Sequence, residues 1–187
     1  ESAYELFSIG SQLELEGRTA EAIEYYKRAQ ALEPGSVSIT LSLAGALYSA
    51  QRFDEGIAVI EGALAIEPEN VRLYQIAALG YIGKRDLGTA VEYYQEALGY
   101  APENRDLYYA IATLLEARGE IRSAMSALER MPSATRNVET YVRLATLAGR
   151  LNDHALAIDY YRMGYATDST DMTAVMGMAA GYDMLGV

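Results

Sequence analysis

One stretch of the sequence, residues 20–34, returns along the chain with a nearly constant spacing. Each copy is marked by a small residue and a larger apolar or aromatic residue four positions later: Ala22 and Tyr26, Gly56 and Ile60, Ala90 and Tyr94, Ala124 and Leu128, Ala157 and Tyr161. Successive small residues are 34, 34, 34 and 33 positions apart. Pro34, Pro68 and Pro102 close the first three copies, and proline cannot continue a helix. Self-similarity at this period indicates an array of stacked supersecondary units.

The first copy, residues 3–36, predicts two helices joined by a tight turn. One face of the first helix carries four small or apolar residues at the i, i+3, i+4, i+7 spacing: Leu6, Ile9, Gly10 and Leu13. Gly17 is expected just beyond the end of that helix, where a left-handed backbone is common. Thr19 is expected to cap the second helix. Two antiparallel helices result.

A 34-residue unit with this first helix, a turn glycine and a second helix carrying Ala22, Tyr26, Ala29 and Pro34 resembles the tetratricopeptide repeat. The resemblance covers nearly the whole chain, because several positions recur together in five units. It implies an all-α fold, a right-handed superhelical α-solenoid of antiparallel helix hairpins. It also implies that the first helices line a concave groove, where a segment of another protein binds.

We predict a single array over residues 1–187. Its five repeats and a terminal half repeat are expected at 3–36, 37–70, 71–104, 105–137, 138–171 and 172–187. Gly56 predicts a close helix crossing, and Asn70 and Asn104 are expected to cap the helices that follow them. Pro132 comes about four residues early in its repeat, so the helix before it should stop near Met131.

The composition excludes several classes of function. With 26 acidic and 15 basic residues the net charge is −11, which repels phosphate backbones and anionic lipids, so we expect no nucleic acid partner. No run approaches the roughly 18 apolar residues of a membrane helix, so no membrane insertion is expected. The chain has no cysteine and no recognisable signal peptide at its start. We expect a soluble protein, with cytoplasm and periplasm both open.

A candidate peptide-binding groove follows from the first helices once their inward packing positions are removed. The remaining side chains form a second stripe with helical spacing: Phe7, Ser11, Leu41, Ser42, Tyr48, Arg72, Gln75, Leu79, Tyr109, Thr113, Arg143, Thr146 and Met176. Over the first three repeats this stripe is aromatic, aliphatic or small and polar, which suits apolar anchor residues of a partner. The alternative for any one position is packing against a neighbouring helix.

Two charged subsites can be considered within this stripe. One subclass of the family clamps a partner's C-terminal carboxylate with Lys, Asn and Arg on successive first helices. The corresponding places here hold Phe7, Ser11, Ser42, Arg72 and Ile76, of which Arg72 alone matches, so this clamp is not expected. Arg143 and Arg150 could bind an acidic group of a partner. The favoured alternative is that they pair with Glu139 or Glu116.

Catalytic and metal-binding chemistry is not indicated. His154 is the single histidine, and it occupies a turn position that Phe53, Leu87 and Ile121 fill in other repeats. Asp153 beside it reads as a helix cap, since no second histidine and no cysteine could complete a transition-metal site. The sequence contains no glycine-rich phosphate loop and no calcium-loop pattern. We expect no enzyme activity, no cofactor and no metal.

Three functions remain, and the first is favoured. It is a non-catalytic scaffold that binds a peptide or protein segment in its concave groove. The second is a structural scaffold that self-associates through Met172 to Val187, a helix rich in methionine where the end of an array usually has a polar face. Such a helix is expected either to continue into a longer array or to pack on another chain. The third is a regulatory array attached to an enzyme elsewhere in a longer chain.

Overall fold

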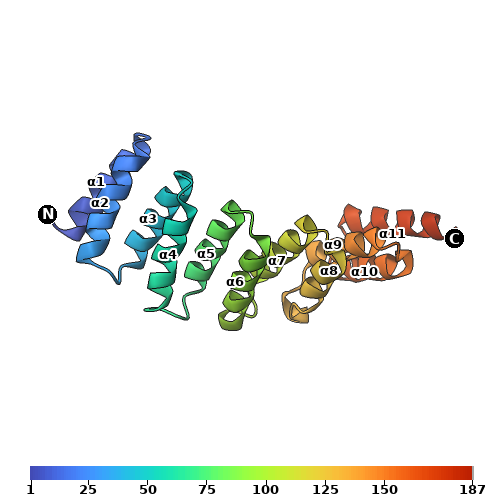
Figure 1. Cartoon of the computed structure of the whole chain (residues 1–187). Helices are drawn as coiled ribbons and strands as arrows, with labels where there is room; N and C mark the ends of the chain where they lie inside the picture. Colours follow the sequence, from blue (N-terminus) through green and yellow to red (C-terminus); the bar gives the residue numbers. More distant parts are fainter. Residues whose placement is uncertain (187) are drawn as a thin grey trace. The chain divides into compact units, whose positions relative to one another are not determined.

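In residues 1–186, which the computed structural model describes, the chain forms eleven α-helices and one 3-10 turn, with no β-strand (Figure 1). The α-helices are α1 (Ala3–Leu15), α2 (Thr19–Leu32), α3 (Val37–Ser49), α4 (Phe53–Leu64), α5 (Val71–Gly83), α6 (Leu87–Tyr100), α7 (Arg105–Ala117), α8 (Ile121–Glu129), α9 (Val138–Arg150), α10 (His154–Thr167) and α11 (Met172–Leu185). The 3-10 turn η1 covers Ser133–Thr135. The all-α fold class is confirmed.

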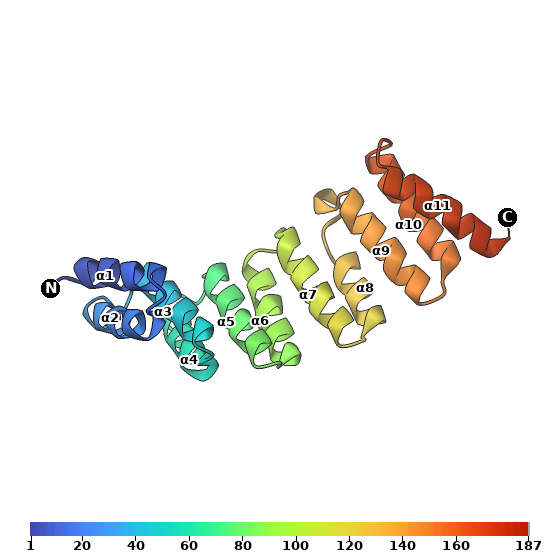
Figure 2. The same ribbon diagram turned by 90° about the horizontal axis from the view of Figure 1, so that it is seen from above.

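The chain divides into two compact units, which are described separately below. Unit 1 is Glu1–Ala101 with helices α1 to α6, and unit 2 begins at Pro102 with helices α7 to α11. In each unit consecutive helices pack as hairpins, and Figure 2 shows the pairs from above. The odd-numbered helices also touch one another, α1 with α3 and α3 with α5 in unit 1, and α9 with α11 in unit 2. A single array over residues 1–187 stays a prediction.

The turn inside each hairpin requires a left-handed backbone at one fixed position. That position recurs at the repeat stride as Gly17, Gln51, Arg85, Gly119 and Asn152, whose φ angles are 76°, 59°, 63°, 79° and 60°. A left-handed conformation costs a residue with a Cβ about 1 kcal/mol, and glycine avoids that cost. Three of the five turns therefore carry a local strain that the sequence pattern does not relieve.

Side-chain caps begin several of the helices. Asn70 and Asn104 accept hydrogen bonds from the backbone N–H groups of Arg72 and Asp106, both at 3.1 Å, as predicted. The prediction for Thr19 is wrong, because α2 already includes Thr19 and its N-cap, Arg18, makes no side-chain cap bond.

The core of unit 1 lies within and between the hairpins and contains glycines where helices approach closely. A Cβ on Gly10 would lie 2.7 Å from the ring of Tyr26, and a Cβ on Gly56 would lie 2.4 Å from the ring of Tyr48. The close crossing predicted at Gly56 is thus confirmed. Around these contacts the fully buried side chains include Leu43, which belongs to the same cluster as Tyr26.

In unit 2 the early proline changes how one helix ends. Helix α8 stops at Glu129, and Pro132 leads into η1, so the predicted stop near Met131 is confirmed. The guanidinium of Arg136 then returns to the helix end and donates to the carbonyls of Met131, at 2.9 Å, and Glu129. These bonds satisfy carbonyl groups that the missing turn of helix would have used.

Candidate functional site

The thirteen predicted groove residues all lie on odd-numbered helices, and together they define the first-helix face of each unit. In unit 1 this face comprises Phe7 and Ser11 on α1, Leu41, Ser42 and Tyr48 on α3, and Arg72, Gln75 and Leu79 on α5. In unit 2 it comprises Tyr109 and Thr113 on α7, Arg143 and Thr146 on α9, and Met176 on α11. None of them is fully buried, and Arg72, Leu79, Thr113, Thr146 and Met176 are exposed.

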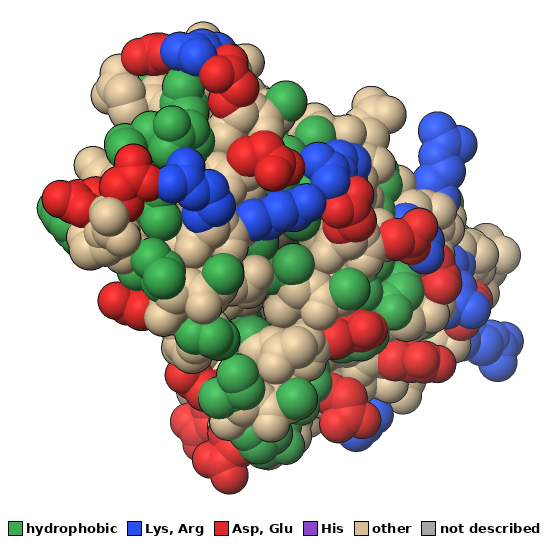
Figure 3. Space-filling view, turned by 60° about the vertical axis from the view of Figure 1, so that its left-hand side comes forward, with side chains coloured by type: hydrophobic (Ala, Val, Ile, Leu, Met, Phe, Trp, Pro, Cys, Tyr) green, Lys and Arg blue, Asp and Glu red, His purple; other side chains and the backbone are tan. Residues whose placement is uncertain are grey.

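Charged residues are rare on two of the unit 1 helices that carry this face. Helix α3 has none, and α5 has only Arg72, which forms no ion pair within residues 1–186. The paired charges of unit 1 belong mainly to the turns and second helices, as in the ion pairs of Arg18 with Glu21 and of Arg52 with Glu55. In Figure 3 acidic and basic side chains lie next to one another across the upper half of the visible face.

On α3 and α5 the face presents apolar and neutral polar side chains. Leu79 is 47% exposed. Leu41 and Ile76 are half-buried and pack against the cluster that contains Leu73 and Ala77. Their remaining accessible surface is apolar, and a partner could cover it without breaking any hydrogen bond or ion pair of the chain.

On α1 the face is partly engaged in packing. The ring of Phe7 lies against the ring of Tyr26, with a centroid separation of 5.6 Å. The hydroxyl of Ser11 donates to the carbonyl of Phe7 at 3.0 Å and accepts from the hydroxyl of Tyr26 at 3.2 Å. Phe7 and Ser11 stay half-exposed, so they contribute less accessible surface than Leu79 does.

The predicted groove residue Tyr48 has a side chain that fills the space between two hairpins. Its ring contacts Gly56 of α4, and its hydroxyl would lie 2.5 Å from a Cβ on Gly80 of α5. The hydroxyl is buried and has no hydrogen-bond partner within residues 1–186. Burial raises the pKa of Tyr48. Two glycines on neighbouring helices leave a gap that the nearest ring occupies, so within the first-helix face the Tyr48 ring is engaged in packing between helices.

In unit 2 a network of polar contacts links α7 with α9 across the face. The hydroxyl of Tyr109 donates to Oδ1 of Asn137 at 2.9 Å and lies 2.8 Å from Oγ1 of Thr140. The guanidinium of Arg143 lies 5.8 Å from the centre of the Tyr109 ring and donates to the hydroxyl of Thr113 at 2.7 Å. Burial raises the pKa of Tyr109.

Glu116 is the centre of this network. Its two carboxylate oxygens pair separately with Arg143 and Arg150, each at 2.7 Å. The favoured alternative for the two arginines, an internal pairing, is therefore confirmed for Glu116. Within residues 1–186 neither arginine pairs with Glu139. Both arginines are already hydrogen-bonded to one shared carboxylate of the chain itself.

Sequence reasoning missed the residues that complete these contacts. Gly80 forms half of the gap for Tyr48, and Thr140 is a fully buried polar residue that meets Tyr109. The place of Gly80 is taken by alanine or leucine in most other repeats, so the periodic pattern gave only a weak signal for it. Asn137 could have been found, since it precedes α9 as Asn70 precedes α5.

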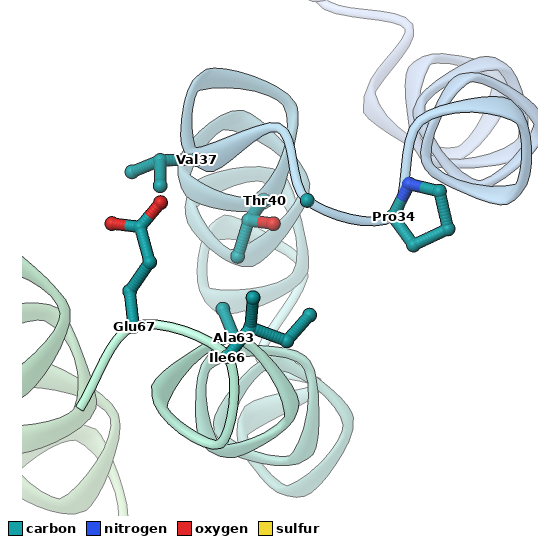
Figure 4. A pocket seen from close by; sticks show the side chains of 7 residues that line it. Pro34, Val37, Thr40, Ala63, Ile66 and Glu67 are labelled. Carbon is teal, nitrogen blue, oxygen red and sulfur yellow. The ribbon is translucent and has the colours of Figure 1, made fainter.

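One of the remaining concavities of unit 1 is too narrow to bind a ligand. Figure 4 shows a crevice between the α2–α3 connection, α3 and the end of α4, with the side chains of Pro34, Val37, Thr40, Ala63, Ile66 and Glu67 along it. The crevice is too narrow to hold a water molecule. It is a seam between α3, the end of α4 and the connection that leads into α3.

Metal and membrane sites were also sought in residues 1–186. This part of the chain holds no group of three or more His, Asp or Glu side chains arranged to bind a metal ion. It holds no helix with the length and apolar character needed to span a bilayer. His154 begins α10 and is half-buried, and Asp153 caps that helix by accepting from the N–H of Leu156 at 3.0 Å, as predicted.

Solved structures of similar fold are numerous. A thermophilic TPR protein of Thermus thermophilus is 18% identical over 96% of this chain and 98% of that one, with a TM-score of 0.55. The structure of MamA protein is 17% identical, covers 89% and 92% of the two chains, and has a TM-score of 0.69. YrrB, described as a TPR protein with an unusual peptide-binding site, is 13% identical over 93% and 90%, with a TM-score of 0.61.

Sequence comparisons give the family. A search among curated proteins returned no match. A family model described as tetratricopeptide repeat matches residues 13–79 and 81–151, which is more than half of the chain. The chain belongs to the tetratricopeptide repeat family.

Proposed function

We propose that this protein is a non-catalytic scaffold that binds a segment of another protein on the first-helix face of unit 1. The tetratricopeptide repeat fold is a scaffold for protein–protein interaction. The partner segment would carry apolar anchor residues, presented by a helix or by an extended stretch.

The observation that carries this proposal is the accessible apolar surface on α3 and α5 in a strongly acidic chain. Leu79 is about half exposed, and Leu41 and Ile76 of the same face are half-buried. Arg72 forms no ion pair within residues 1–186. Covering a leucine side chain completely is worth about 1.5–3 kcal/mol before the cost of association, so the affinity depends on how many such contacts the partner segment makes. Arg72 would help to orient a carboxylate of the partner.

An array of random peptides probed with the labelled protein tests the proposal. We expect the retained peptides to be enriched in Leu, Ile, Phe and Met. For a selected peptide, Leu79→Glu should raise Kd at least about tenfold, because a buried unpaired charge opposes the contact. The matched control is Leu32→Glu, since Leu32 is 55% exposed at the end of the second helix α2. Equal affinities for the two variants would contradict the proposal.

A second function, self-association through α11, is favoured by a separate observation. Three methionines of this helix, Met172, Met176 and Met184, are exposed, and Met176 is 66% accessible. Sedimentation equilibrium over a wide concentration range tests this function. We expect a dimer that Met176→Lys dissociates and that Met163→Lys, on the exposed side of α10, leaves intact. A protein that stays monomeric at every concentration would rule this second function out.

A further inference from the structure

Four tyrosines form a continuous row on the α5–α6 hairpin of unit 1. The ring centroids are 5.2 Å apart for Tyr81 and Tyr93, 6.3 Å for Tyr93 and Tyr74, and 5.7 Å for Tyr74 and Tyr100. The two tyrosines of each helix are seven residues apart, which is two turns, and the helices are antiparallel, so rings from α5 and α6 alternate. We call these four residues the tyrosine row.

The row is separate from the first-helix face, although one of its rings, Tyr93, also packs against the core cluster that contains Leu73 and Ala77. The core position on α6 is taken by the neighbouring Tyr94, which is buried, whereas Tyr100 is 45% exposed and the other three rings are half-exposed. On α5, Tyr81 lies two residues beyond Leu79, which is a rotation of about 200° around the helix. The row and Leu79 therefore lie on opposite sides of α5.

Two carboxylates flank the row without a basic partner. Glu61 of α4 accepts hydrogen bonds from the hydroxyl of Tyr93 at 2.7 Å and from that of Tyr81 at 3.3 Å. Glu96 lies between Tyr93 and Tyr100 on the same face of α6, three residues after one and four before the other. Neither Glu61 nor Glu96 takes part in an ion pair within residues 1–186.

The electrostatics around the row favour positive charge. Residues 1–101 contain fifteen acidic and seven basic residues, a net charge of −8 out of the −11 of the whole chain. Partial burial, and then the neighbouring Tyr100 and the carboxylate of Glu96, raise the pKa of the Tyr74 hydroxyl. A cation near the row would be attracted by the carboxylates and by the negative faces of the rings.

One end of the row already binds a cation of the chain itself. The ammonium group of Lys84 lies 5.7 Å from the centre of the Tyr81 ring and pairs with Asp54. No such cation lies over the rings of Tyr93, Tyr74 or Tyr100 in the described part of the chain. The contact at Tyr81 shows that a ring of the row can hold a positive charge near its face.

We infer that the tyrosine row is a second docking surface, which binds an arginine-bearing extended segment of a partner protein. Alternate side chains of an extended segment are about 6.6 Å apart, close to the ring spacings of the row. Planar guanidinium groups would stack on the rings, and Glu61 and Glu96 would accept their N–H groups. Lysine fits less well, because its compact ammonium group stacks poorly on a ring and stays strongly hydrated.

Isothermal titration of the whole chain with a peptide in which three arginines alternate with glycines tests this inference. We expect saturable binding at physiological salt, and a Kd about fivefold higher when lysines replace the arginines. Tyr100→Leu should also raise Kd about fivefold, and Glu96→Gln should raise it about threefold while keeping the shape of the side chain.

Matched controls separate this site from a general attraction of the acidic chain for basic peptides. Tyr165 on α10 is 42% exposed, and Glu139 on α9 is exposed, so Tyr165→Leu and Glu139→Gln make the same changes in unit 2. Both should leave Kd within about twofold of the original value, as should Leu79→Glu on the first-helix face. Equal binding of the arginine and lysine peptides, or equal losses in row and control variants, would overturn the inference.

Discussion

The first-helix faces of the two units are built at the same repeat positions but from different chemistry. The place of Ile82 on α5 is taken by Glu116 on α7, and the place of Ile76 is taken by Arg143 on α9. In unit 2 these charged residues bind one another, so a partner could gain from them only by breaking existing bonds. In unit 1 the isoleucines offer apolar surface that a partner can cover directly. The comparison teaches that equivalent positions of one repeat can be bound within the chain in one unit and keep accessible apolar surface in another.

The largest effect is expected when unit 1 receives a side chain that unit 2 has at the same position. Gly80 corresponds to Leu114, and a Cβ at Gly80 would lie 2.6 Å from Cγ1 of Ile57. Gly80→Leu should lower the free energy of unfolding by about 3 kcal/mol because of overpacking. Urea unfolding followed by circular dichroism measures the loss, and hydrogen exchange should locate it in unit 1. Gly45→Leu is the control, since no side chain lies within 4 Å of a Cβ there.

A smaller effect is expected from the polar network of unit 2. Glu116→Ala leaves Arg143 and Arg150 without their shared carboxylate, and Arg143 is only 26% exposed. The free energy of unfolding should fall by about 2 kcal/mol. Arg72→Ala, which removes an unpaired and exposed arginine from unit 1, should change it by less than about 0.5 kcal/mol. Thermal unfolding of both variants measures the difference, and equal losses would remove the contrast between the two faces.

Removing a tyrosine hydroxyl should change the free energy of unfolding differently in the two units. Tyr109→Phe removes a hydroxyl that bonds to Asn137 and Thr140, and we expect a loss of about 1 kcal/mol. Tyr48→Phe removes a buried hydroxyl without a partner in the described residues, and we expect no loss or a small gain in stability. Denaturant midpoints of the two variants suffice to decide. A loss at Tyr48 as large as that at Tyr109 would show that its hydroxyl is satisfied.

The smallest effect concerns the hairpin turns. Arg85 in unit 1 has a φ of 63°, and its counterpart in unit 2 is Gly119, with a φ of 79°. Arg85→Gly should raise the free energy of unfolding by about 0.5 kcal/mol, since relief of the left-handed strain exceeds the entropic cost of glycine. Gly119→Ala should lower it by a similar amount. Calorimetric Tm values of the two variants should move in opposite directions, and movement in the same direction would refute this account of the turns.

Several details of the fold were predictable because they are local. The caps at Asn70 and Asn104 depend on a side chain and an N–H group two residues away, and the stop near Met131 depends on Pro132. The cap at Thr19 failed for an equally local reason: the hairpin turn is one residue shorter than the pattern suggested, so Thr19 lies inside the first turn of α2.

The candidate face was predictable in position but not in chemistry. All thirteen residues lie on the odd-numbered helices, as the spacing required. Their availability depends on neighbours that are far away in the sequence. Tyr48 fills a gap that involves Gly80, thirty-two positions later, and Arg143 meets Glu116 across two helices. The tyrosine row lies within residues 71–104, and only the packing of α5 against α6 places its four rings side by side.

The sequence by itself determined the repeat, the all-α hairpins and the helix faces, because a helix of fixed period places every third or fourth side chain on one side whatever surrounds it. The tertiary structure alone decided which of those side chains are already bound to a neighbour and which still have free surface. Whether a side chain is engaged depends on the gaps between helices. A single glycine or a charged pair there changes which side chain can fit, over distances of a few ångströms.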